Sequence, residues 1–268
     1  MGNSSNLFKV FASYNKVTTM YCKTKGLLLI LIILISSCNS SDETVVLQQQ
    51  IDCLPSSLQN GVIAYYTFSN GSINDVSGNG NHLTNNTSAS SGTDRDGNLN
   101  CAFEFNLENS EYLEYQNPTF LDDLHLNDFS ISFWLNISSN SGLGNFISRD
   151  NTLNCTWTEG QWSVVYVNDV IQFGVNGAVA IEDEMVSLNN WEHFTVTASG
   201  TNLKFYRNGI LSVEEIDGYL CELANPTINE GDLFIGKIGG LMDDIIIYNR
   251  LLTDSEVNEL YNLPPCCN

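Results

Sequence analysis

The sequence has few basic residues and lacks the short motifs of several enzyme classes. Only 10 of its 268 residues are lysine or arginine, against 31 aspartates and glutamates, so the formal net charge is −21. A chain this acidic repels nucleic acid and anionic membrane surfaces, and we expect no nucleic-acid partner. It contains no Gly-x-Ser-x-Gly elbow, phosphate loop or nucleotide fingerprint. It also has no Cys-x-x-Cys pair to indicate structural zinc.

No hydrophobic run in the leader is long enough to cross a bilayer. The apolar run at residues 27–35 has nine residues, whereas a spanning helix needs about 20. It follows Lys23 and Lys25, and the next segment, Ile35-Ser36-Ser37-Cys38, resembles the lipobox of bacterial lipoproteins. The resemblance implies a signal peptide at residues 1–37 and lipidation of Cys38. The alternative is an ordinary signal peptide that is cleaved near the two serines.

The mature chain is predicted to be a polar linker followed by one domain. Residues 38–51 are too polar to bury a core, and residues 52–268 are enough for one large all-β domain. The acidic stretch after Cys38 resembles the surface-export signal of Bacteroidetes lipoproteins, which implies a lipid anchor on the bacterial outer membrane, facing the cell surface. Without the four leader lysines, six basic residues face 31 acidic ones, a net charge of −25. That surface favours divalent cations, or serves solubility alone.

Alternating apolar and polar residues predict short strands along most of the domain. Asn208-Gly209 is a strong hairpin signal because both residues tolerate positive φ. Thr253 and Glu256 form a capping box that starts one short C-terminal helix, which Pro264-Pro265 ends. The predicted strands are residues 61–68, 129–136, 162–167, 170–175, 191–198, 202–207, 210–215, 233–236 and 243–248. The pattern predicts an all-β fold, an antiparallel β-sandwich.

Six cysteines remain in the mature domain, and an even number in an exported protein indicates disulfides. The ends of a domain often lie close together. We therefore expect one or both of the terminal cysteines to bridge back to the first two, which leaves Cys155 with Cys221. The six are Cys53, Cys101, Cys155, Cys221, Cys266 and Cys267.

Five segments resemble the LamG-like jelly roll of the concanavalin A-like lectin/glucanase superfamily. They occur in the family's order over about residues 61–262, and the resemblance implies a jelly-roll sandwich. Functions in this superfamily vary, so the fold alone does not assign an activity. The segments are residues 64–71, 74–82, 129–134, 191–196, and 235–236 with 240–250.

The resemblance also implies a structural calcium ion. The loop at residues 74–82 and the last of the five segments, at residues 240–250, would share it. The candidate ligands are Asp75, Asn79, Asp243 and Asp244, whose oxygen atoms suit calcium. The alternative is that Asp75 and Ser77 only cap a tight turn through side-chain hydrogen bonds.

The superfamily includes glucanases, which place their catalytic carboxylates on one strand as Glu-x-Asp-x-x-Glu. Glu215-Ile216-Asp217 matches the first half of this motif. A second form of the motif has one extra residue, at a β-bulge, before its last glutamate, and Glu222 comes one residue late even for that form. We therefore expect a protein that is not an enzyme.

Binding remains as the expected function, with a glycan or a surface protein as the partner. Flat aromatic faces hold sugars, and the candidates are Trp157, Trp162, Tyr166 and Tyr219. The alternative for Trp162 and Tyr166, four residues apart in a strand, is that both face the core. Trp134 and Trp191 are interpreted as core residues.

Overall fold

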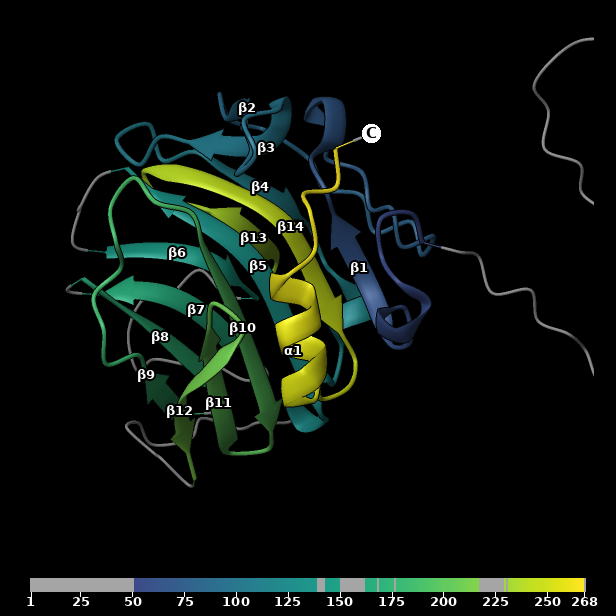
Figure 1. Cartoon of the computed structure of the whole chain (residues 1–268), viewed down its shortest axis with the longest axis vertical. Coiled ribbons are helices and arrows are strands. Elements are labelled where there is room, and N and C mark those ends of the chain that lie inside the picture. The colour runs from purple at the N-terminus through teal and green to yellow at the C-terminus, as the bar shows by residue number, and fades with distance from the viewer. Residues whose placement is uncertain are drawn as a thin grey trace, which may run out of the picture. The chain divides into compact units, whose positions relative to one another are not determined.

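The computed structural model (Figure 1) describes residues 51–138, 143–149, 162–167, 169–175, 177–216, 229 and 231–267. The predicted signal peptide, Cys38 and nearly all of the linker lie outside these residues. The predicted site residues Cys155, Trp157, Tyr219 and Cys221 also lie outside them, as do Asp217 and Glu222 of the rejected glucanase-like match. Within the described ranges, no helix is long and apolar enough to cross a membrane.

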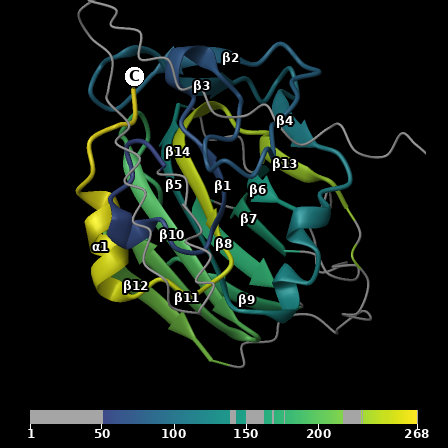
Figure 2. The ribbon, with the colours of Figure 1, turned by 90° about the vertical axis from the view of Figure 1, so that its right-hand side faces the viewer.

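The described strands form two antiparallel sheets, as the sequence predicts. The eight-stranded sheet runs in the order β12 (Ile210–Glu215), β11 (Asn202–Arg207), β10 (Glu192–Ser199), β5 (Phe129–Ile137), β14 (Gly240–Tyr248), β3 (Leu99–Phe105) and β2 (Ser90–Thr93), and β1 (Val62–Tyr66) also pairs with β14. The six-stranded sheet runs in the order β4 (Tyr112–Tyr115), β13 (Leu233–Gly236), β6 (Leu143–Ser148), β7 (Trp162–Val167), β8 (Val170–Val175) and β9 (Ala178–Ile181). Figures 1 and 2 show the two sheets facing each other as a sandwich.

The main core lies between the two sheets. Strand β5 sends Phe129, Ile131, Phe133 and Leu135 into it, as the alternation in its sequence predicts. Strand β7 contributes from the opposite sheet. Each such side chain stabilises the fold by about 1.5–3 kcal/mol when it is fully buried.

Helix α1 (Asp254–Tyr261) lies on the outer face of the eight-stranded sheet (Figure 2). The predicted capping box is present, because Thr253 Oγ1 accepts from the Glu256 amide and Glu256 Oε2 accepts from the Thr253 amide. Val257 and Leu260 are buried in a second, smaller cluster with Tyr206. The helix thereby covers part of a sheet face that would otherwise meet water.

Two disulfides tie the ends of the domain together, and both terminal cysteines take part. Cys53 is bonded to Cys266 and Cys101 to Cys267, with a Cα–Cα distance of 5.5 Å in each pair. The structure thus contains the expected bridges from the C-terminal cysteines to the first two. The C-terminal segment is consequently held against the eight-stranded sheet beyond α1.

Candidate functional site

Asp75, the first predicted calcium ligand, caps its own loop. Its Oδ1 accepts from the Tyr65 amide at 3.0 Å and from the Ser77 amide at 2.9 Å, and its Oδ2 accepts from the Asn81 amide at 3.0 Å. This is the turn-capping arrangement given above as the alternative to calcium. The carboxylate fastens the loop to strand β1.

Asn79 holds the same loop by its amide nitrogen. Its Nδ2 donates to the carbonyl oxygens of Val62 and Ile63, both at 3.2 Å. Ser77 Oγ accepts a further bond from that nitrogen. The side chain therefore anchors the loop to β1 through its donor end.

Asp243 and Asp244 lie at a β-bulge in β14, where the register with β5 shifts and Asp244 takes a positive φ of 45°. The bulge brings both carboxylates to Arg95. Arg95 Nη1 lies 2.8 Å from Asp243 Oδ2 and 2.9 Å from Asp244 Oδ2. Burial and then the neighbouring Asp244 raise the pKa of Asp243, while Arg95 opposes that rise.

Asp75, Asp243 and Asp244 thus accept from protein donors in this structure, whereas the Asn79 side chain donates to carbonyl oxygens. Tyr65 links the loop at residues 74–82 to the β14 bulge, because its amide donates to Asp75 and its hydroxyl donates to Asp244, both at 3.0 Å. A bound calcium ion stays a prediction.

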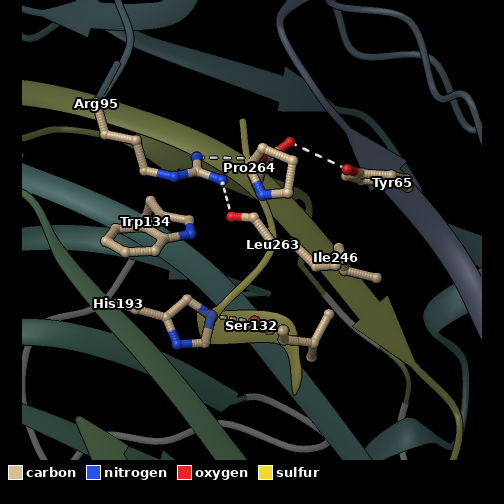
Figure 3. Close-up of a pocket in the computed structure, with 10 residues that line it drawn as sticks. Tyr65, Arg95, Ser132, Trp134, His193, Ile246, Leu263 and Pro264 are labelled. Carbon is tan, nitrogen blue, oxygen red and sulfur yellow. Dashed lines mark hydrogen bonds and ion pairs between the residues drawn. The ribbon is translucent and has the colours of Figure 1, made fainter. Parts of the chain in front are cut away.

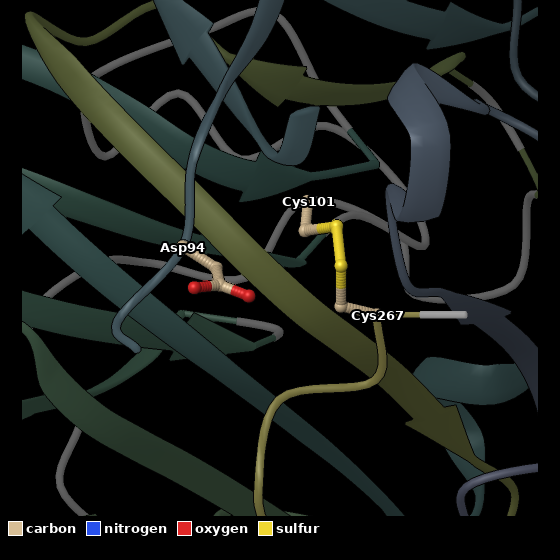
Figure 4. A group of neighbouring side chains, drawn as sticks. All are labelled: Asp94, Cys101 and Cys267. Carbon is tan, nitrogen blue, oxygen red and sulfur yellow. A yellow bond between two sulfur atoms is a disulfide. The ribbon is translucent and has the colours of Figure 1, made fainter. Parts of the chain in front are cut away.

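A different group of potential ligands lies near the C-terminus. Within the described part of the chain, Asp94, Cys101 and Cys267 form the one cluster of three such residues whose ligand atoms lie within 4.8 Å of one another (Figure 4). Its two sulfur atoms are joined in a disulfide. Asp94 accepts from the amides of Asp96 and Asn98, which fits a turn before β3.

Arg95 is the centre of a polar cluster between the eight-stranded sheet and the C-terminal segment (Figure 3). Its guanidinium lies 4.4 Å from the centre of the Trp134 ring, and its Nη2 donates to the Leu263 carbonyl at 3.2 Å. The Trp134 ring stacks on Tyr261 of α1, with 5.7 Å between ring centres. The cluster joins the loop before β3, strand β5, helix α1 and the C-terminal segment.

Beside Trp134, the ring of His193 and the hydroxyl of Ser132 are 2.9 Å apart. Nucleophilic catalysis would need a third group to orient the histidine. Among the described residues, His193 Nδ1 has no hydrogen-bond partner. Burial and then the charge of Arg95 lower the pKa of His193 to about 3, so the ring is neutral near pH 7.

The cavity at this cluster has about 10 Å³ available to the centre of a water-sized molecule. That is room for about one water molecule, and a sugar ring does not fit. The cluster therefore acts as a clamp for the C-terminal segment.

The prediction that Trp162 and Tyr166 offer flat aromatic faces to a sugar is wrong. Both are buried in the core between the sheets, because side chains four apart on a strand share one face and here that face is the inner one. Trp157 and Tyr219 lie outside the described residues. Trp134 is buried as expected, but beneath α1, whereas Trp191 is only half-buried.

A second group of polar side chains lies on the outer face of the six-stranded sheet, and the residues of this group are buried. Strand pairing aligns one residue from each of five strands there, while their neighbours Leu113, Val164 and Ile235 face the core. We call this line the outer-face row. It consists of Glu114, Phe234, Ser148, Ser163 and Gly174.

Glu114 and Ser163, two members of the outer-face row, have buried polar side chains. Glu114 Oε1 accepts from Asn86 Nδ2 at 2.6 Å and from Gln116 Nε2 at 3.2 Å. Ser163 is 1% exposed, and among the described residues no hydrogen-bond partner reaches its hydroxyl.

At the β4 end of the row, Tyr112 and Phe234 meet edge to face with 5.4 Å between ring centres. The Lys237 ammonium lies 4.0 Å from the centre of the Phe234 ring and 5.0 Å from that of Tyr112. Sequence reasoning missed this group, because its members come from segments about 120 residues apart and only the pairing of β4 with β13 joins them.

Solved structures with a similar fold include toxin binding domains. They include the binding domain of Paraclostridial Mosquitocidal Protein 1 (20% identity, TM-score 0.60, 76% of this chain and 52% of that one) and the receptor binding domain of botulinum neurotoxin C/D mosaic serotype (17%, 0.57, 76% and 51%). A third belongs to botulinum neurotoxin type C, which depends on interaction with two ganglioside molecules to enter cells (16%, 0.56, 77% and 52%). The chain spans about half the length of these structures. At such identities the likeness shows a shared fold.

A laminin G family described as the concanavalin A-like lectin/glucanases superfamily matches residues 107–258. The match covers more than half of the chain, and the observed sandwich of two antiparallel sheets with one short C-terminal helix agrees with it. The chain belongs to the concanavalin A-like lectin/glucanases superfamily.

Proposed function

We propose that the domain is a non-catalytic binding module that recognises carbohydrate at the β4 end of the outer-face row. The observation that carries the proposal is the gathering of Tyr112, Phe234 and Lys237 beside Glu114. Sugars bind where apolar ring faces lie next to a few fixed polar groups. Phe234 and Glu114 are buried, so the accessible groups are the half-exposed Tyr112 and the exposed amides of Asn86 and Gln116 that contact Glu114.

The likeness to toxin binding domains supports a glycan as the ligand. One of those toxins depends on gangliosides, which carry sugar headgroups. The superfamily fold hosts lectins, and a sandwich face can hold a sugar without any reacting group.

The single carboxylate of the outer-face row favours binding over hydrolysis. Glycoside hydrolysis uses two carboxyl groups about 5–5.5 Å apart for retention or about 6.5–9.5 Å apart for inversion. The outer-face row supplies one, Glu114, which two amide groups already contact. Of the glucanase-like trio, Glu215 ends β12, and Asp217 and Glu222 lie outside the described residues.

The proposal includes a lipid anchor. Residues 1–37 would act as the signal peptide, Cys38 would carry the lipid, and residues 38–51 would hold the domain away from the outer membrane. A tethered module facing the cell surface can reach glycans on other cells or in the matrix. The membrane contact would then be the lipid alone, because the acidic domain repels anionic lipid.

A glycan array tests the proposal. The protein would be the chain without residues 1–37 and with Cys38→Ser, applied with calcium and with a chelator. We expect binding to a defined glycan that falls at least tenfold in Tyr112→Ala and persists in Leu99→Ala, a control at an exposed leucine of β3. Binding that survives the chelator would remove calcium from the sugar site.

Absence of binding in both arms would refute the carbohydrate proposal. Binding that Tyr112→Ala leaves unchanged would move the site away from the β4 end of the outer-face row. Unfolding curves of both variants show whether any loss comes from the site or from the fold.

A further inference from the structure

Large apolar side chains are exposed where β12 and the segment after β9 lie side by side. Ile210 is 69% exposed, Met185 68% and Ile216 64%. Together with Ile181 and Leu211, also exposed, we call them the β12 surface. Single exposed apolar residues need no explanation, but a contiguous group of them marks an interaction site.

Hydrogen bonds show that the two segments are neighbours. Arg207, the ladder partner of Ile210, donates from Nη2 to the Met185 carbonyl at 3.0 Å. Ser212 Oγ donates to Glu182 Oε1. The exposed apolar side chains are therefore spread along β12 and the neighbouring segment, with Ile210 at the start of the strand and Ile216 just after its end.

Strand β12 ends the eight-stranded sheet. It pairs with β11 on one side, and among the described residues no strand pairs with its other side. An edge strand offers unpaired backbone amides and carbonyls to another chain. Proteins commonly protect such edges with charges and bulges, and β12 has a bulge opposite Phe205 and Tyr206. Its exposed Ile210 and Leu211 weaken that protection.

The charges around this edge are acidic. Asp183, Glu184 and Glu214 are exposed. The two nearby cations are already paired, since Lys204 Nζ lies 3.4 Å from Glu214 and Arg207 Nη2 lies 2.6 Å from Glu192. A second copy of a chain with net charge −21 would bring like charges together, whereas a cationic segment would complement them.

We propose that the β12 surface docks an extended protein segment with alternating apolar and basic side chains, which pairs with β12 as an added strand. Main-chain hydrogen bonds to the open edge would supply affinity, and the apolar and acidic groups would select the partner. The site is separate from the outer-face row and does not depend on carbohydrate binding.

The test uses a fluorescent, end-capped octapeptide of alternating lysine and valine, with fluorescence anisotropy as the readout. The protein is the chain without residues 1–37 and with Cys38→Ser. We expect saturable binding that weakens with added salt and falls at least tenfold when Ile210→Lys and Ile216→Lys are combined. Leu99→Lys, at another exposed apolar residue, should leave the affinity unchanged. The changed side chains are exposed, and equal melting temperatures would verify that the variants fold.

Two controls make the result specific. An alternating glutamate–valine octapeptide should not bind, and hydrogen exchange should show new protection of β12 amides only with the lysine–valine peptide. The proposal is overturned by absence of binding, by equal binding of the acidic peptide, or by affinity that the double variant leaves unchanged. Self-association of the free protein that the double variant abolishes would also overturn it, with a second copy as the occupant.

Discussion

The guanidinium of Arg95 lies 4.4 Å from the centre of the Trp134 ring, beneath the C-terminal segment of the chain. The same guanidinium binds both carboxylates of the β14 bulge and the Leu263 carbonyl. One side chain thus joins strands β5 and β14 to the last residues of the domain. Asp243 and Asp244, two of the predicted calcium ligands, have this cation as their partner.

Arg95→Met is expected to destabilise the domain by about 3–5 kcal/mol near pH 7, because it leaves two buried carboxylates without their cation. Urea unfolding would measure the loss. Lys204→Met removes the exposed pair with Glu214 and should cost no more than about 1 kcal/mol. The loss in Arg95→Met should shrink as the pH falls, since protonation removes the uncompensated charges. Equal losses in the two variants would contradict the clamp role.

His193 is expected to make stability depend on pH between about 6.5 and 3. Its folded pKa of about 3 lies below the ordinary value of 6.5, so in this window the unfolded chain binds the extra proton. Its contribution is complete above pH 6.5 and is lost as the pH falls, by up to about 1.4 kcal/mol per pH unit. Unfolding free energies of wild type and His193→Gln across this range would reveal the difference. Parallel curves would contradict a buried neutral histidine.

Removing either disulfide is expected to cost about 2–5 kcal/mol, since each closes a long loop in the unfolded chain. The bonded residues are 213 and 166 apart, and loop entropy grows only slowly with length. The double variants Cys53→Ser with Cys266→Ser and Cys101→Ser with Cys267→Ser should therefore lose similar amounts. Thermal unfolding without reductant is the measurement, and a loss confined to one pair would show that local packing dominates.

Asp75→Ala is expected to cost roughly 3 kcal/mol even with chelator present, because three backbone amides lose a charged acceptor. Asp96→Ala, at an exposed acidic residue, is the control and should change stability little. Melting curves with and without calcium separate the two roles of Asp75. A cost that exists only with calcium present would show that the ion, and not the cap, needs this carboxylate.

Local sequence patterns predicted much of the fold because the interactions concerned are local. The capping box of α1 acts within three residues, and the Asn208-Gly209 turn takes the positive φ values of 50° and 78° that its residues tolerate. Alternation along β5 correctly predicted which of its side chains enter the core. The resemblance to the superfamily rested on the same segments.

Other strands gave weak patterns. The sequence did not predict β2, β4 and β9, each four residues long and each at the edge of its sheet. A four-residue strand shows too little alternation to stand out from a loop. Strand β6 was also missed, because a bulge between Asn145 and Ile147 interrupts its alternation.

The sequence by itself determined the β-sandwich, its C-terminal helix and the presence of disulfides, since these depend on periodicity, capping and cysteine content. Only the tertiary structure decided that Trp162 faces the core, that Arg95 lies with Asp243, and that Glu114 lies beside Phe234. Periodicity shows which side chains share a face, but the pairing of strands distant in sequence decides which face is buried and which residues meet on it.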